Sequence, residues 1–425
     1  MLTPRTAVFA ALGAMLVGLL AVAAFTAPTT LRGLHGDVGL YFDVGERLAR
    51  GEVPYRDGPF EYPPLALVPI ALARFVPSPQ SVDLGTFAAR LLVLNTALAA
   101  VAFTLVAWLA AQNRRDAWRS AATAGATFAL GGVLLGALVV WRYDILAAVL
   151  TVGALALLVG GRPTLAGLAL GAAVAAKLYA APLAVLFIGW HLARREWSAA
   201  ARFTAGFTAV GVAAFALFVV PRLDPTFLSY QLDRGLQVES VPAGIVGLAH
   251  LLGVDAITST GFGSVQVESA LTGTLLAAFG WLAPIAVGLV VLAGLARLRQ
   301  GRDGGLDMVP TLAALAAATL LAVITTNKAL SPQYLIWLLP FVPMLSAGPR
   351  HLMLAAIALT VLVFPILYAG LVALEPIPIV ALNLRNALLI ATLVWLVVEQ
   401  TPALRTVAIR RPTPALHTHA AGAGH

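Results

Sequence analysis

Long uninterrupted apolar runs alternate with short polar segments along most of the chain. The runs at 7–25, 91–111, 205–220 and 273–296 each approach the roughly 20 residues that a helix needs to cross a bilayer. They are continuous rather than alternating, which indicates helices and not the strands of a membrane barrel. The pattern therefore predicts an all-α polytopic membrane protein. The first run is too long for a removable signal peptide and lacks a small-residue cleavage site, so it is interpreted as the first span.

Basic residues in the short loops orient these spans, because cytoplasmic loops of membrane proteins are enriched in arginine and lysine. This rule gives about 12 spans with both termini in the cytoplasm. Spans are expected at about 7–27, 86–111, 121–140, 145–160, 163–176, 200–220 and 273–296, and a sixth span returns to "HLARREW" (191–197). Four more spans end at "TTNKALSPQY" (325–334), at Arg350, near 371 and before "RTVAIRR" (405–411). Two long segments, 28–85 and 221–272, then face the outside of the plasma membrane, and the functional site is expected there.

The stretch "YPPLALVPIALARFV" (62–76) is apolar but contains three prolines. At about 15 residues it is too short to span, and counting it as a span would invert everything that follows. We therefore predict an interfacial or re-entrant helix. Residues 1–400 are expected to form one integral membrane domain, and 401–425 a disordered cytoplasmic tail.

Composition supports a membrane protein and narrows the chemistry. The chain is 60% hydrophobic and 11% charged, with a mean hydropathy of +0.91, whereas soluble domains are about half apolar and about a quarter charged. It has no cysteine, which excludes disulfides, thiolate metal sites and cysteine nucleophiles. The sequence pI is near 10.3, but the positive charge is scattered through short loops, so no nucleic-acid partner is expected. No metal or cofactor is predicted either.

The segment "HGDVGLYFDVGERL" (35–48) places carboxylates directly after the first span. Its apolar and polar residues separate onto two faces, which predicts an amphipathic helix in the outer interface. Asp37 lies at the start of that helix and is interpreted either as a helix cap or as a catalytic group. Asp43 and Arg47, four residues apart, are expected to form a solvated pair.

Other polar residues gather where the predicted spans reach the outer side. They are Arg142, Tyr143, Asp144, Lys177, Tyr179, Asn327, Lys328, Ser331, Gln333 and Tyr334. Ionisable groups at membrane depth are costly and indicate function, and converging cations suit a phosphate or pyrophosphate. The alternative is that these arginine and lysine side chains snorkel or form structural ion pairs. Loop 221–272 contains Tyr230, Asp233, Arg234, Glu239 and His250, and is expected to shape an acceptor site.

Three segments carry a resemblance to a known family. The stretch "GDVGLYFDVGERLARGEVPYRDGPFEYPPLALVPIAL" (36–72) resembles the first outer loop of glycosyltransferase family 87, with an Asp after span one, a nearby Tyr, Gly-x-x-Pro-Tyr and Tyr-Pro-Pro. "GLALGAAVAAKLYAAPL" (167–183) is similar to the family's Gly-rich span, and "NKALSPQYLIWLLP" (327–340) to its late Ser-Pro-Gln-Tyr segment. The chain departs from the family at "VVWRYD" (139–144), where relatives often have Gly-Gln-x-Asn.

The resemblance implies a GT-C-like bundle of about 12 transmembrane helices with interfacial helices between spans one and two. It also implies a glycosyltransferase, similar to the actinobacterial α-mannosyltransferases, that moves mannose or another hexose or pentose from a polyprenyl-phosphate donor. The acceptor would be a lipid-linked or cell-envelope glycan on the extracytoplasmic side, and the membrane lipids would be further partners.

Within that family pattern Asp37 is expected to be the general base. The predicted donor phosphate-binding residues are Arg142, Lys177, Lys328 and Arg385, and the predicted substrate-binding residues are Tyr41, Tyr55, Tyr62, Tyr143, Asp144, Gln333 and Tyr334. One base with direct attack implies inversion at the anomeric carbon, because a retaining site uses two carboxylates.

Three other functions compete with this interpretation. A transporter or flippase of a lipid-linked sugar or another anionic lipid would show broken helices and internal symmetry at mid-membrane, but the two halves show no convincing repeat. A noncatalytic assembly or scaffold protein is another alternative, and only an activity assay can exclude it. A lipid-phosphate phosphatase or ligase would share the cationic site but does not account for the order of the motifs between Asp37 and the Tyr-Pro-Pro at 62–64.

Overall fold

A computed structural model describes residues 3–32, 37–77, 80, 82–112, 116–221, 223–301 and 307–401. This part of the chain is mostly helical, with a single two-stranded sheet among the described residues. The expected tail lies almost wholly outside the described residues.

Seven of the described helices are long and apolar enough to cross a membrane. They are α1 (Pro4–Leu31), α4 (Leu84–Ala111), α10 (Trp197–Val219), α13 (Thr272–Gln300), α14 (Met308–Thr326), the continuous run Ala347–Ile366 made of α16 (Ala347–Val361) and η4 (Leu362–Ile366), and α18 (Pro376–Gln400). The prediction of a helical, multi-pass membrane protein is confirmed.

The other predicted spans are shorter or interrupted helices. They are α5 (Ala117–Leu134) continued by α6 (Gly136–Trp141), α7 (Asp144–Val159), α8 (Pro163–Ala176), η2 (Leu178–Ala180) with α9 (Leu183–Ala193), and α15 (Tyr334–Leu338) with η3 (Val342–Met344). The count of about 12 spans is therefore not confirmed by helix length. Several of these short helices end next to polar residues, and those ends build the site described below.

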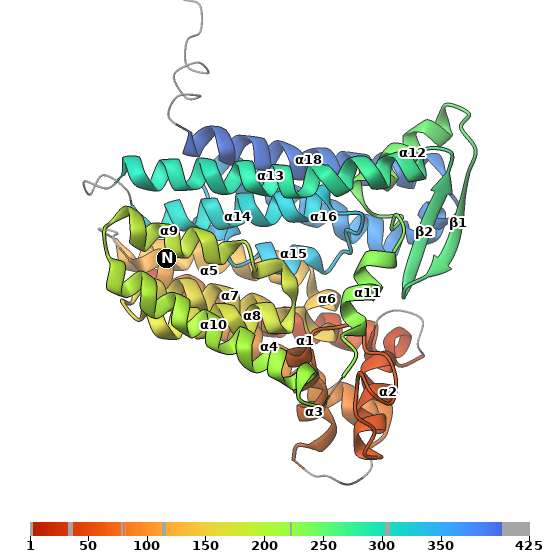
Figure 1. Cartoon of the computed structure of the whole chain (residues 1–425), viewed down its shortest axis with the longest axis horizontal. Coiled ribbons are helices and arrows are strands. Elements are labelled where there is room, and N and C mark those ends of the chain that lie inside the picture. Colours follow the sequence, from red (N-terminus) through yellow and green to blue (C-terminus); the bar gives the residue numbers. More distant parts are fainter. Residues whose placement is uncertain are drawn as a thin grey trace, which may run out of the picture.

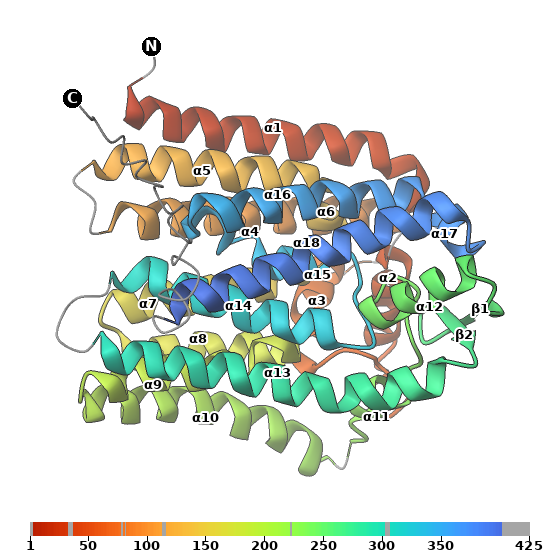
Figure 2. The ribbon, with the colours of Figure 1, turned by 90° about the horizontal axis from the view of Figure 1, so that it is seen from above.

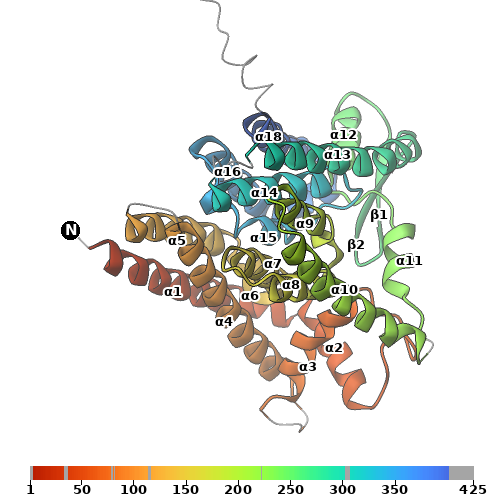
Figure 3. The same cartoon turned by 60° about the vertical axis from the view of Figure 1, so that its left-hand side comes forward.

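The long helices run side by side, and the connecting segments gather at one end of the bundle. Figure 2 shows the start of α1 and the end of α18 at the same end, with α11, α12, β1 and β2 at the opposite one. Figures 1 and 3 place α2 (Val38–Ala49) and α3 (Leu67–Phe75) below α11, and in Figure 1 α2 lies toward that opposite end. Helix α14 is buried along nearly its whole length, so it forms the centre of the bundle.

Helix α2 is amphipathic, as the sequence predicts. It buries Val38, Tyr41 and Val44 and exposes Asp43. The expected pair of Asp43 with Arg47 does not form, because the Arg47 Nε instead donates to Glu52 Oε2 at 2.7 Å.

The carboxylate one turn after Asp43 has a structural partner. Glu46 Oε1 accepts from Arg74 Nε at 2.6 Å, and the Arg74 side chain is only 4% exposed. This ion pair joins α2 to α3. The apolar helical stretch that contains α3, Pro64–Phe75, has 12 residues and is too short to cross a bilayer.

The segment 221–272 was expected to be a loop, but the structure folds it into four elements. These are α11 (Thr226–Asp233), α12 (Val241–Leu251), β1 (Ala256–Gly261) and β2 (Ser264–Ser269), the strands forming an antiparallel hairpin. Phe262 and Gly263 connect the strands, both with positive φ (52° and 60°), as a two-residue type I′ turn requires. The alternation of β-branched residues around Gly-Phe-Gly was the sequence signal for this hairpin.

Helices α8 and α10 approach each other closely through glycine. A Cβ on Gly167 would lie 2.0 Å from the Phe203 carbonyl oxygen, and one on Gly206 would lie 2.3 Å from that of Thr164. Small residues allow such contact between membrane helices. This pair of helices forms one wall of the apolar groove described below.

Candidate active site

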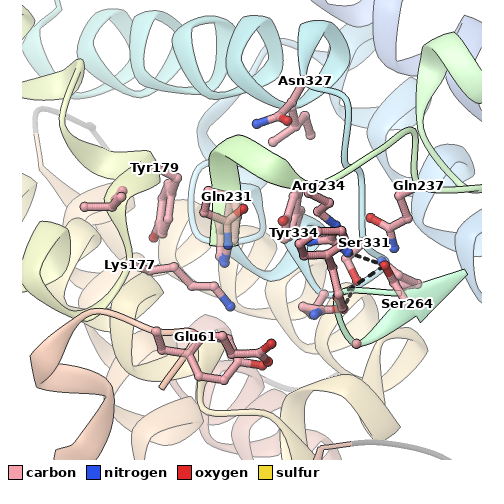
Figure 4. A pocket seen from close by; sticks show the side chains of 18 of the residues that line it. Glu61, Lys177, Tyr179, Gln231, Arg234, Gln237, Ser264, Asn327, Ser331 and Tyr334 are labelled. Carbon is pink, nitrogen blue, oxygen red and sulfur yellow. Dashed lines mark hydrogen bonds between the residues drawn. The ribbon is translucent and has the colours of Figure 1, made fainter. Parts of the chain in front are cut away.

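A cavity of about 760 Å³ lies where the connecting segments gather. Its lining includes the start of α2, the loop before η1, the ends of α6, α8 and α14, the segment between α11 and α12, the hairpin turn and the start of α15. Figure 4 shows side chains from several of these segments, among them Glu61, Lys177 and Arg234, pointing into the same pocket. The site therefore depends on the tertiary fold, since no single stretch of sequence supplies it.

The carboxylate of Asp37 lines this cavity and forms an ion pair with Arg142, whose Nη1 donates to Asp37 Oδ2. The hydroxyls of Tyr41 and Tyr62 lie 3.3 Å from the same oxygen. Within the described part of the chain the Asp37 side chain makes no capping hydrogen bond to α2. All its contacts there fall on Oδ2, so Oδ1 is left as a free acceptor.

The two tyrosines beside Asp37 act as hydrogen-bond donors to it. Burial, and secondarily the negative charge of Asp37, raise the pKa of Tyr41 and of Tyr62 well above the ordinary value. Both phenols therefore stay protonated near neutral pH. Together with Arg142 they hold the carboxylate in one orientation.

Lys177 is the second cation in the lining, and Asp144 fixes its position. The Lys177 Nζ lies 2.7 Å from Asp144 Oδ1, and Trp337 Nε1 donates to the same oxygen at 2.7 Å. Asp144 is fully buried. The Lys177 Nζ also lies 4.7 Å from the ring centroid of Tyr143 and 5.3 Å from that of Tyr62, both within the range of cation–π contact.

Aromatic stacking holds Trp337 in place. The rings of Tyr179 and Tyr334 each stack on Trp337 with centroids 4.0 Å apart. Tyr179 comes from the short η2 helix and Trp337 from α15, so the stack ties two interrupted spans together at the cavity.

The turn that carries Arg142 is also held by a buried side chain. Asn95 on α4 is fully buried, and its Nδ2 donates to the carbonyl oxygens of Val140 at 2.9 Å and Arg142 at 3.2 Å. This contact satisfies carbonyls left open at the end of α6. It also fixes the direction in which Arg142 leaves the helix.

A second carboxylate, Glu61, lines the cavity and was not singled out from the sequence. It lies near Tyr230 of α11, where burial and a hydrogen bond to Glu61 raise the pKa of the Tyr230 hydroxyl. The position of Glu61 between Phe60 and the Tyr-Pro-Pro motif was the sequence signal that could have indicated its place in the site. Among the described residues no group of three or more histidine or carboxylate side chains is placed to hold a metal ion.

The structure brings about half of the predicted residues into the lining. Asp37, Tyr62, Arg142, Lys177, Gln333 and Tyr334 line the cavity. Tyr41, Tyr143 and Asp144 are buried directly behind it. Tyr55 is buried too, and its hydroxyl donates to the Tyr62 carbonyl oxygen at 2.7 Å.

Lys328 and Arg385, the other predicted phosphate-binding residues, do not lie in the lining. The Lys328 Nζ donates to the Leu232 carbonyl oxygen at 2.7 Å. Arg385 on α18 is 1% exposed, and its Nη2 lies 2.5 Å from the Glu239 carbonyl oxygen. Both cations support the main chain of the segment around α11 and α12.

An apolar groove of about 830 Å³ adjoins the cavity. It runs along α8 and α10 from Gly171 and Phe207 to Leu223, and it shares Pro63, Leu178 and Phe227 with the cavity lining. The polar cavity is therefore continuous with an apolar surface on α8 and on the membrane-length helix α10.

A sequence model described as glycosyltransferase family 87 matches residues 60–326, which is more than half of the chain. The matched range contains Glu61, Arg142 and Lys177, while Asp37 precedes it. No curated protein and no solved structure gives a match.

Proposed function

Because the chain belongs to glycosyltransferase family 87, we propose that this membrane glycosyltransferase takes its sugar from a polyprenyl-phosphate donor. The sugar is a hexose or pentose such as mannose, and the acceptor is a lipid-linked or cell-envelope glycan. Transfer takes place on the extracytoplasmic side of the plasma membrane, with inversion at the anomeric carbon.

The observation that carries this proposal is that the predicted base shares a single cavity with two of the predicted phosphate-binding cations. Asp37, Arg142 and Lys177 share the lining, although they lie in three distant parts of the sequence. A base for the acceptor hydroxyl and positive charge for a phosphate are the two requirements of sugar transfer from a lipid phosphate.

The reaction follows from these positions. The acceptor hydroxyl gives its proton to the free Oδ1 of Asp37 as its oxygen attacks the anomeric carbon. The bond between that carbon and the phosphate oxygen breaks, and its electron pair leaves with the lipid phosphate. Lys177 and Arg142 stabilise the negative charge that develops on this leaving group.

The groove on α8 and α10 supports a lipid-linked donor. Its lining is almost entirely apolar between Gly171 and Leu223, and it meets the cavity at Leu178, next to Lys177. A prenyl chain in the groove would present its phosphate to the cation of Lys177. Each buried methylene group of such a chain adds about 0.8 kcal/mol of binding free energy.

The substitution Asp37→Asn tests the assignment of the base. Asparagine keeps the shape of the side chain and still accepts hydrogen bonds, but it cannot take the proton. A general base contributes about 10²–10⁴-fold to rate, so we expect transfer to fall by that factor while donor binding persists. The measurement is transfer of radiolabelled mannose, glucose or arabinose from undecaprenyl-phosphate carriers by the purified protein in nanodiscs.

The matched control is Asp43→Asn, which removes an exposed carboxylate from the same helix and should leave transfer within a few-fold of wild type. Transfer by Asp37→Asn at the wild-type rate would show that Asp37 is not the base. Absence of transfer from every lipid-phosphate sugar by the wild-type protein would refute the choice of donor.

A further inference from the structure

Three buried polar side chains between α11 and α12 line the cavity, and the reaction described above uses none of them. Arg234, Gln237 and Glu239 are 9%, 2% and 3% exposed and all belong to the lining. We refer to these three residues as the polar wall. Figure 4 shows Arg234 and Gln237 across the pocket from Tyr179 and Lys177.

The main chain of the polar wall is held from several sides. The backbone N–H of Gln237 donates to the Lys328 carbonyl oxygen at 3.0 Å. The backbone of Gln237 also pairs with that of Gln266 in β2 as an isolated β-bridge. The Nη2 of Arg385 holds the Glu239 carbonyl oxygen. The side chains of the wall are therefore presented on a fixed backbone, which is how recognition sites obtain their precision.

The polar wall has unused hydrogen-bonding capacity. Arg234 Nη2 donates to Ser264 Oγ at 2.7 Å, and Gln237 Nε2 donates to Glu239 Oε2 at 3.0 Å. Among the described residues, however, Arg234 Nε and Gln237 Oε1 are buried without a partner. Leaving buried polar atoms unpaired is costly. One of these atoms is a donor and the other an acceptor, so a ligand must offer both functions.

Glu239 adds a group of the same dual character. Burial raises the pKa of its carboxyl to about 7, so near neutral pH it exchanges between an acceptor and a donor form. Tyr334 and Tyr368 line the cavity too. Apolar and aromatic surface with a few placed polar groups is typical of a small-molecule site.

We propose that the polar wall binds the hydroxyl groups of a sugar ring. A hydroxyl is both donor and acceptor, and so it matches the unpaired atoms of Arg234 and Gln237, which a phosphate, having only acceptors when ionised, does not. The inference rests on the proposed function, and the ring is either the sugar of the donor or that of the acceptor.

The experiment compares ligands with and without a sugar on the full-length protein in nanodiscs. Dissociation constants are measured for undecaprenyl phosphate, for its mannosyl, glucosyl and arabinosyl derivatives, and for octyl α-mannoside against octanol. In the wild-type protein at least one sugar-bearing ligand should bind more tightly than its sugar-free counterpart. In Gln237→Ala that advantage should shrink by about threefold to tenfold, the effect of one lost hydrogen bond.

The pattern of loss identifies the source of the sugar. If Gln237→Ala weakens the binding of an undecaprenyl-phosphate sugar but not that of undecaprenyl phosphate, the polar wall binds the donor sugar. If Gln237→Ala weakens the binding of octyl α-mannoside but leaves that of undecaprenyl phosphate and its sugar derivatives unchanged, the polar wall binds the acceptor sugar. Gln300→Ala is the matched control, because Gln300 is exposed at the end of α13 and should change none of these constants.

Two results would overturn the proposal. One is that Gln237→Ala leaves every constant unchanged, and the other is that it weakens sugar-free and sugar-bearing lipids equally. If Gln237→Ala does not fold, the isosteric Glu239→Gln decides by the same comparison.

Failure of the wall and failure of the proposed function are separate outcomes. Suppose that the wild-type protein binds undecaprenyl phosphate and transfers sugar, but that substituting Gln237 or Glu239 does not change its tighter binding of sugar-bearing ligands. This result would refute only the role of the polar wall. A wild-type protein that binds none of the lipid phosphates refutes the proposed donor itself.

Discussion

The ion pair between Asp144 and Lys177 fixes the position of one cation in the cavity. Asp144 is fully buried and Lys177 is 13% exposed, while Trp337 donates to the same carboxylate. Removing one partner of a buried pair leaves an uncompensated charge and destabilises a protein by about 3–5 kcal/mol. Under the proposed function, stability and catalysis are therefore coupled through Lys177.

A double substitution separates these two effects. Lys177→Met should lower the thermal midpoint markedly and reduce transfer, because Asp144 loses its cation and the proposed donor phosphate loses a cationic contact. The pair Lys177→Met with Asp144→Asn should recover much of the stability, since asparagine is neutral and still accepts from Trp337. Transfer should stay low in both. The measurements are thermal unfolding and the transfer assay in the same nanodiscs.

The control for this comparison is Arg50→Met, which removes a cation whose side chain is 60% exposed and should change the free energy of unfolding by no more than about 0.5 kcal/mol. Recovery of transfer in the double variant would contradict a phosphate role for Lys177. An unchanged thermal midpoint in Lys177→Met would contradict the buried ion pair.

At the scale of elements, the pairing of α8 with α10 creates both a close contact and a groove. The two helices touch at Gly167 and Gly206, and the groove extends from Gly171 toward the cavity. A Cβ on Gly211, which lines the groove, would meet nothing within 4 Å. The glycines in this pair therefore serve two purposes, contact at one end and open space at the other.

Filling the groove tests whether it holds the donor lipid. We expect Gly211→Trp to raise the KM for an undecaprenyl-phosphate sugar at least about tenfold, because displacing two methylene groups at about 0.8 kcal/mol each has that effect. The kcat at saturating donor should change little. Steady-state kinetics over a range of donor concentrations measures both constants.

Gly280→Trp on α13 is the matched control, since a Cβ there also meets nothing within 4 Å and Gly280 is not part of the groove. It should behave as wild type. Equal kinetics for the two tryptophan variants would mean that the prenyl chain lies elsewhere.

The elements also show where prediction from local sequence succeeded and where it did not. Helix α2 was predicted with its buried and exposed faces, because amphipathic spacing is a local property. The hairpin β1–β2 and helices α11 and α12 were expected to be a loop. Their stability depends on packing against distant segments, such as the pairing of Gln237 with Gln266, and this does not appear in local hydropathy.

At the scale of the whole molecule, charge asymmetry predicts the orientation of the bundle in the membrane. The cavity lies at the end of the bundle opposite the start of α1 and the end of α18 (Figure 2). From the positive-inside rule we expect that start and end in the cytoplasm, and we therefore propose that the cavity faces the extracytoplasmic side. The absence of native cysteine makes the arrangement directly testable.

Cysteine labelling in intact cells should separate the two ends. Ser259→Cys in β1 should react with a membrane-impermeant maleimide, whereas Ser198→Cys at the start of α10 should react only after permeabilisation. Each variant serves as the control for the other, because both are conservative changes in a cysteine-free chain. The reverse pattern would invert the bundle and place the cavity in the cytoplasm.

The sequence by itself determined the class of the protein and the identity of several cavity residues. Apolar runs near the length of a bilayer can satisfy their backbone only as helices, so the membrane helices follow from local composition. Asp37, Arg142 and Lys177 could be singled out because a charged residue beside or within an apolar segment is costly unless it is used.

Only the tertiary structure decided which polar groups reach the cavity. Lys328 and Arg385 were as plausible as Lys177 by sequence, yet their side chains hold the carbonyl oxygens of Leu232 and Glu239. Conversely Gln237, with no local signal, enters the lining. The destination of a long polar side chain depends on which partners the packing of distant helices brings within about 3 Å, and this information is not local to any segment.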